Sequence, residues 1–104
     1  MTTPAVPPLD DPRVAALWPR LSDADATVRR LALIALSEDE DEAALPWLHW
    51  ALQDVAPEVR AEAASRLVYH EDPEILQALV RALRDPADLV RRAAAHTLAE
   101  LKEA

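Results

Sequence analysis

Hydrophobic and polar positions recur along this chain with a period of 31 residues, as Leu21, Leu52 and Leu83 show. Each copy has a leucine followed two residues later by an aspartate, then a Val-Arg pair, then an alanine and another leucine. The three copies are Leu21, Asp23, Val28, Arg29, Ala32 and Leu36; Leu52, Asp54, Val59, Arg60, Ala63 and Leu67; and Leu83, Asp85, Val90, Arg91, Ala94 and Leu98. A fixed period without insertions predicts stacked supersecondary units rather than a globule around one central core.

Each unit has the hydrophobic spacing of two amphipathic helices. The first helix has a core stripe at i, i+3 and i+7, and the second at i, i+4 and i+8. The first-helix stripes are Val14, Leu17 and Leu21; Leu45, Leu48 and Leu52; and Leu76, Leu79 and Leu83. The predicted helices are 12–21, 26–37, 42–52, 57–69, 73–84 and 87–102. The spacing therefore predicts an all-α fold of six helices.

These helices divide the chain into a tail and one repeat domain. The predicted segments are a flexible, proline-rich tail at 1–9 and a single domain at 10–104, with repeats at about 10–40, 41–71 and 72–102. Asp11-Pro12 and Asp72-Pro73 are typical N-caps followed by a first-turn proline. We expect Pro46 to delay the start of the third helix. Pro19 is expected to kink the first helix or to end it early.

Composition excludes several classes of function. Nineteen acidic residues against eleven basic ones give a net charge of −8, which argues against general binding of nucleic acid or of anionic membranes. The absence of cysteine excludes disulfides, thiolate metal sites and cysteine nucleophiles. No apolar run is long enough for a signal peptide or a membrane span. We therefore expect a soluble, cytoplasmic protein.

The aspartate with a valine five residues on and an arginine six residues on, inside a two-helix unit, resembles the HEAT-repeat pattern. The short period is similar to the HEAT-like repeats of phycobilisome (bilin) lyases, and the resemblance covers about residues 10 to 102. It implies a HEAT-like α-solenoid of three two-helix repeats. It also implies an Asp–Arg ladder between successive turns, formed by Asp23, Asp54 and Asp85 with Arg29, Arg60 and Arg91.

Histidine and acidic residues offer one candidate for metal chemistry. His70-Glu71 is similar to the His-Glu dyads of deoxyhypusine hydroxylase, an iron enzyme of related repeats, but the slots after Val-Arg do not keep that dyad. The segments 39–41 and 70–72 occupy equivalent turns, and their oxygens suit a hard cation. The alternative is a solvated acidic edge at helix N-termini, which we favour. We expect no catalytic residue, no cofactor and no resident metal.

Two tryptophans form the first candidate for a protein-binding surface. Trp47 and Trp50 lie about 140° to 200° around the third helix from Leu45, at ~100° per residue. This phase predicts that they point outward on the convex layer, with Pro19 nearby. Exposed aromatic pairs are typical of contact sites. Two alternatives stay open: the tail covers them, or they pack inside and the phase is misjudged.

The second helices offer another candidate. Their non-core positions are predicted to line a shallow groove on the concave face, with arginine at both ends. The residues that we expect to bind there are Arg30, Leu33, Ile34, Val68, Arg92 and His96.

These features favour a protein–protein interaction module, a non-catalytic adaptor or accessory subunit that docks on a larger complex. The protein partner would be part of an enzyme complex, and dimerisation stays open. Two alternatives rest on the resemblance: a bilin (tetrapyrrole) lyase-like subunit or chaperone, and a metal-dependent HEAT-repeat enzyme.

Overall fold

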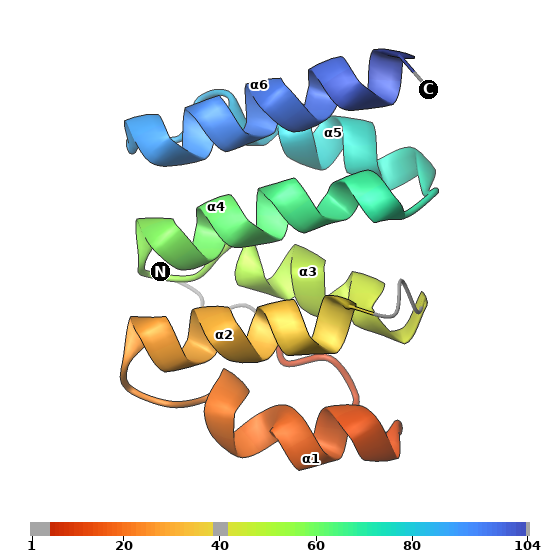
Figure 1. Cartoon of the computed structure of the whole chain (residues 1–104), viewed down its shortest axis with the longest axis vertical. Helices are drawn as coiled ribbons and strands as arrows, with labels where there is room; N and C mark the ends of the chain where they lie inside the picture. The colour runs from red at the N-terminus through yellow and green to blue at the C-terminus, as the bar shows by residue number, and fades with distance from the viewer. Residues whose placement is uncertain (1–4, 39–41, 104) are drawn as a thin grey trace.

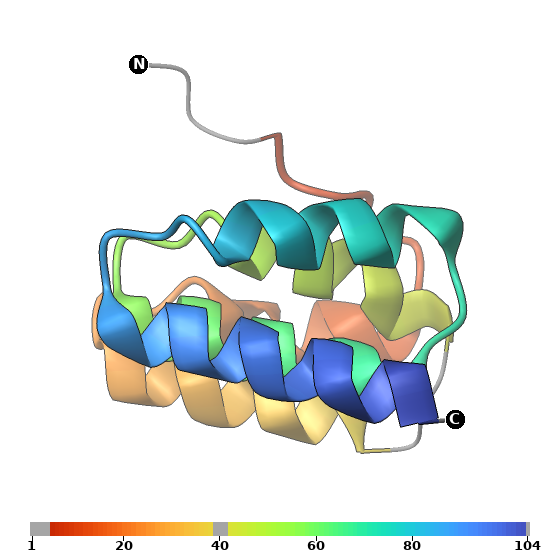
Figure 2. The same ribbon diagram turned by 90° about the horizontal axis from the view of Figure 1, so that it is seen from above.

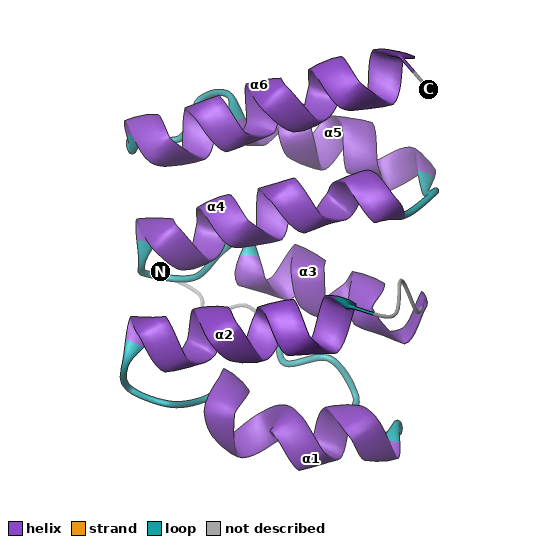
Figure 3. Cartoon of the chain, viewed as in Figure 1, coloured by secondary structure: helices purple, strands orange, loops and turns teal. Residues whose placement is uncertain are grey.

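A computed structural model of the chain describes residues 5–38 and 42–103, which form helices and no strands (Figure 1, Figure 3). The α-helices are α1 (Pro12–Leu21), α2 (Ala26–Ser37), α3 (Leu45–Ala51), α4 (Pro57–Arg66), α5 (Pro73–Ala82) and α6 (Asp88–Glu103). Short 3-10 helices precede α3 (η1, Glu42–Ala44) and follow α4 (η2, Leu67–Tyr69). The predicted all-α fold of six helices is confirmed.

Capping and proline explain where the helices begin. Asp11 accepts hydrogen bonds from the backbone N–H groups of Arg13 and Val14 at 2.8 and 3.4 Å, and Asp72 accepts one from Glu74 at 2.8 Å. Each cap satisfies donors that have no partner in the first helical turn. Pro46 lies in the first turn of α3, which starts three residues later than predicted, after η1.

Pro19 does not end the first helix early. The helix α1 continues through it to Leu21, and the Ser22 N–H bonds to the Trp18 carbonyl at 2.9 Å. Proline removes one internal hydrogen bond, which the last turn tolerates because its following amides still find acceptors.

The helices form two layers (Figure 2). The first helices α1, α3 and α5 lie in one layer, and the second helices α2, α4 and α6 lie in the other. The second helices pack on one another more extensively than the first helices do. Residues 5–10 run along the layer of the first helices without helical structure.

The core lies between the layers and contains most of the repeated columns. The buried members of these columns are Val14, Leu21, Ala32, Leu36, Leu48, Val59, Ala63, Leu67, Leu79, Val90 and Ala94. The prediction that Leu76 and Leu83 belong to the core is wrong, because both side chains are exposed. The helix α5 instead buries Ile75, Ala78 and Leu79, and Leu76 is 56% exposed.

The Asp–Arg ladder joins successive repeats. Arg29 donates to both carboxylate oxygens of Asp54 at 3.0 and 2.9 Å, and Arg60 donates to both oxygens of Asp85 at 2.9 and 3.0 Å. Hydrogen bonding to Asp54 raises the pKa of Arg29, and hydrogen bonding from Arg60 lowers the pKa of Asp85. These are two-point, charge-assisted contacts between repeats. Both pairs have the cross-repeat geometry that the resemblance implies.

A membrane span needs a helix that is both long and apolar throughout. No helix within residues 5–38 and 42–103 combines these two properties.

Candidate functional site

The tryptophans belong to the packing between repeats one and two. Trp47 is 2% exposed, so the prediction that it points outward is wrong. The centroid of its ring lies 5.7 Å from that of Trp18 and 5.4 Å from that of Trp50, and the Trp18 and Trp50 centroids are 6.1 Å apart. Offset and edge contacts at these distances stabilise aromatic clusters. Trp50 and Trp18 are partly buried against the core, while Pro19 is exposed.

The error came from the phase of the third helix. Placing the stripe at Leu45, Leu48 and Leu52 put Trp47 outside it. In the structure η1 buries Ala44 and α3 buries Trp47, Leu48 and Ala51, so the buried face is rotated by about one residue. The indole of Trp47 packs on two other indoles. Val6 and Leu9 of the tail stay exposed.

The second helices form a groove along α4 and α6, which we call the α4–α6 groove. It consists of two adjoining depressions of about 460 and about 230 Å³ that share Glu62, Ser65 and His96. The first depression is lined by Arg30, Glu58, Ala61, Glu62, Ser65, Leu89, Arg92, Ala93 and His96. The second is lined by Glu62, Ser65, Arg66, Val68, Tyr69, His96, Thr97 and Glu100.

The groove brings together four of the residues predicted for this face. Arg30, Val68, Arg92 and His96 line it. Leu33 does not, because it is buried in the core between the layers. Ile34 is partly buried and lies outside the lining of both depressions.

Two exposed residues at the ends of the groove were missed. Leu89 at one end is 53% exposed and Tyr69 at the other is 51% exposed. The sequence carried a signal for Leu89, because the positions 31 and 62 residues earlier are Glu58 and Thr27. An apolar residue in an otherwise polar column indicates a surface that differs between repeats. Tyr69 stood at the end of the predicted fourth helix, where η2 turns it outward.

Charged side chains in the α4–α6 groove are largely paired, either with one another or with Asp88 beside the groove. Glu62 bridges Arg30 at 3.2 Å and Arg66 at 3.1 Å, and Arg92 pairs with Asp88 at 2.7 Å. His96 pairs with Glu100 one turn along α6 when its ring is protonated. The pairs are partly or largely exposed, so each contributes little to stability. They leave Arg92, with 80% of its side chain exposed, available to a second molecule.

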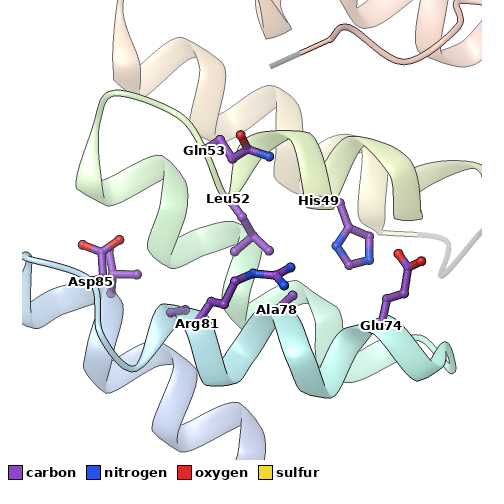
Figure 4. Close-up of a pocket in the computed structure, with 9 residues that line it drawn as sticks. His49, Leu52, Gln53, Glu74, Ala78, Arg81 and Asp85 are labelled. Atoms are coloured by element: carbon purple, nitrogen blue, oxygen red, sulfur yellow. The ribbon is translucent and has the colours of Figure 1, made fainter. Parts of the chain in front are cut away.

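A second groove lies between α3 and α5, in the layer of the first helices (Figure 4). This α3–α5 groove has a volume of about 580 Å³. Its lining consists of His49, Leu52, Gln53, Glu74, Ala78, Arg81, Ala82, Asp85 and Val90. His49, which is partly buried, points from α3 toward Glu74 on α5 (Figure 4).

The acidic edge that was considered for a cation is described only in part. His70 is buried and caps η2, whereas Glu71 is exposed. The segment 39–41, the other half of this candidate cluster, lies outside the described residues. Within residues 5–38 and 42–103 no three histidine or carboxylate side chains form a group that could hold a metal ion.

Helix pairs stacked in register and joined by Asp–Arg contacts define an α-solenoid. The chain belongs to the HEAT repeats, whose family model matches residues 14–99. The match is to HEAT repeats in general and does not single out the bilin-lyase type. No curated protein matched the sequence.

Proposed function

We propose that this chain is a non-catalytic protein-interaction module, an adaptor or accessory subunit that binds a partner protein through the α4–α6 groove. HEAT repeats are commonly protein-interaction modules, and the chain belongs to that family. We propose the adaptor role, a protein as the partner, and the α4–α6 groove as the surface that binds it.

The observation that carries the proposal is the composition of the groove. Exposed Tyr69 and Leu89 mark its two ends, and Arg30, Arg66 and Arg92 lie along it. Tyrosine and arginine are enriched in protein interfaces, because each combines a large apolar contact area with directional hydrogen bonds. Small residues between them, such as Ala61 and Ala93, let another backbone approach closely.

Charge supports a protein rather than a nucleic acid as the partner. The groove arginines are matched by Glu58, Glu62 and Glu100 in the same lining, and the whole chain has a net charge of −8. Nucleic-acid binding draws much of its affinity from unopposed cationic side chains on phosphates. Alternating charges instead suit a partner surface with both signs, which fixes register and orientation.

Isolation of the partner and calorimetric titration test the proposal. The tagged chain would be purified from its host, and the partner identified and titrated against purified variants. Tyr69→Ala and Arg92→Glu should each weaken binding about tenfold or more, as loss of an interface anchor does. The controls Leu76→Ala and Arg84→Glu change residues of similar exposure in and beside α5, on the other layer.

The controls should bind as tightly as the wild type. Full binding by both groove variants would refute the α4–α6 groove as the site. A loss confined to Leu76→Ala would place the contact on the exposed side of α5. The same purification tests the bilin-lyase alternative, since a bound tetrapyrrole would give the co-purified protein absorbance in the visible region.

A further inference from the structure

The two interfaces between successive first helices are filled differently. Between α1 and α3 the space is occupied by three indoles, those of Trp18, Trp47 and Trp50, whose centroids lie 5.4 to 6.1 Å apart. Between α3 and α5 lies the α3–α5 groove, with a volume of about 580 Å³. The first helices of all three repeats occupy equivalent places in the 31-residue period, so the side chains at equivalent positions of the two interfaces can be compared.

The repeat period identifies those side chains. Thirty-one residues after Trp18, Trp47 and Trp50 the sequence has His49, Ala78 and Arg81. All three line the α3–α5 groove. Alanine at position 78 leaves open the space that an indole fills one repeat earlier, and Arg81 is exposed where Trp50 packs on the cluster. The groove is therefore the counterpart of the tryptophan cluster, with its large aromatic rings replaced by smaller or polar groups.

Several polar groups of the groove could form hydrogen bonds or ion pairs that they do not form with the described residues. His49 Nε2 is buried and has no hydrogen-bond partner among the described residues. The guanidinium of Arg81 makes no hydrogen bond or ion pair within residues 5–38 and 42–103, and neither does the carboxylate of Glu74. In Figure 4, His49 and Glu74 meet at one end, and Arg81 extends beneath Leu52 toward them. Buried polar atoms in folded proteins usually bond to a protein group or to an ordered water, so His49 Nε2 is an atypical polar atom beside the groove.

These charges complement an aromatic ring. The face of an indole is electronegative and attracts a guanidinium, which here is that of Arg81. Its edge is electropositive and carries an N–H donor, for which the exposed Glu74 carboxylate is an acceptor. The apolar remainder of the ring would contact Leu52 and Ala78, as the indole of Trp47 contacts the core one repeat earlier.

We propose that the α3–α5 groove binds a tryptophan side chain carried by a partner protein. The inserted indole would restore at the second interface the aromatic packing that the chain supplies for itself at the first. This site lies on the opposite layer from the α4–α6 groove and does not depend on it.

A blocked amino acid tests the site before any partner is identified. N-acetyl-L-tryptophanamide would be titrated into the full ¹⁵N-labelled chain, and amide shifts would be followed by NMR. We expect saturable shifts centred on His49, Ala78 and Arg81 with a Kd on the order of 1 mM, a value typical of one small ring without flanking contacts. N-acetyl-L-leucinamide, which has no ring for Arg81, should bind at least fivefold more weakly.

Two variants and one control locate the effect. Ala78→Trp repeats the arrangement at Trp47 and should fill the groove from within, abolishing binding. Arg81→Ala, at an exposed position that does not threaten folding, should weaken binding about fivefold or more. Arg84→Ala changes an exposed arginine outside the lining and should bind as the wild type does.

The outcomes are decisive even if Ala78→Trp fails to fold. No saturable shift, shifts centred on Trp18 and Trp50, or equal binding of the leucine and tryptophan probes would each overturn the proposal. Unchanged binding by Arg81→Ala would do the same, because it would remove the guanidinium from the site. Saturable, ring-selective shifts that Arg81→Ala weakens and Arg84→Ala does not would support it.

Discussion

Replacing Arg60 with alanine is the most direct test of how the repeats are held together. Its guanidinium donates two hydrogen bonds to the Asp85 carboxylate, at 2.9 and 3.0 Å, and a third to the Asp54 carbonyl at 2.8 Å. The side chains of Arg60 and Asp85 are 15% and 12% exposed, so water only partly screens the pair. The substitution removes all three bonds, while the Asp85 carboxylate keeps its hydrogen bond from the Ala87 N–H.

The expected cost follows from these contacts. A hydrogen bond to a charged group contributes about 1.5 to 3 kcal/mol, and breaking a fully buried ion pair costs about 3 to 5 kcal/mol. Because this pair is mostly rather than fully buried, we expect a loss of about 3 kcal/mol in the free energy of unfolding. For a domain of this size that corresponds to a fall in Tm of roughly 12 to 24 °C.

Chemical denaturation and calorimetry would measure the loss, and Arg91→Ala provides a matched control. Arg91 is the residue equivalent to Arg60 in the next repeat. Its guanidinium donates a hydrogen bond to the backbone carbonyl of Asp85 at 2.7 Å, just as Arg60 does to that of Asp54. It pairs at 3.4 Å with Asp88 on its own helix, and 42% of its side chain is exposed. Among the described residues Arg91 pairs with no carboxylate of another repeat. Replacing it with alanine should therefore lower the free energy of unfolding by about 1 kcal/mol.

Equal destabilisation by the two variants would refute this reasoning, because it would assign the effect to the carbonyl bond that both arginines make. The reasoning would also be contradicted if the double variant Arg60→Ala, Asp85→Ala lost as much unfolding free energy as the two single variants lose together. Residues that contact each other are expected to show a coupling energy of about 0.5 to 3 kcal/mol.

Three further predictions concern acid, the tryptophan core and metal. Hydrogen bonding from Arg60 lowers the pKa of Asp85 below its ordinary value of 3.8, so the stabilisation is complete above that pH and is lost as the pH falls through the lowered pKa. The difference in unfolding free energy between wild type and Asp85→Asn should therefore shrink in acid, and a constant difference would contradict the assignment. Trp47→Ala should cost about 3 to 5 kcal/mol because the side chain is buried, whereas Leu76→Ala at an exposed site should cost under about 1 kcal/mol. Chelation should leave Tm unchanged, since the apolar columns between the layers stabilise the stack, and a clear drop would indicate a metal site.

Local and periodic features could be predicted from the sequence. The bounds of α1 and α2 agree with the predicted ones, because caps and helical spacing act over a few residues. The ladder was predictable by resemblance, since an aspartate and an arginine repeat in fixed columns. The sequence also predicted that non-core residues of the second helices line a groove. Four of the six residues named for it line the α4–α6 groove: Arg30, Val68, Arg92 and His96.

Side-chain exposure was decided by tertiary structure. Trp47 and Leu76 both lie near the edge of a helical stripe, where a rotation of about one residue, or ~100°, moves a side chain between core and surface. The spacing of apolar residues along a short helix does not determine that rotation, because several phases fit it equally well.

The sequence alone determined the repeat and its helices, and its resemblance to HEAT repeats predicted the residues that join one repeat to the next. Only the stacked structure decided which spaces between helices are filled. The interface of α1 and α3 is closed by three indoles, whereas that of α3 and α5 is open, although the helices are equivalent. The physical reason is that a groove depends on the combined volume of side chains from two repeats, at positions that meet only when the helices pack.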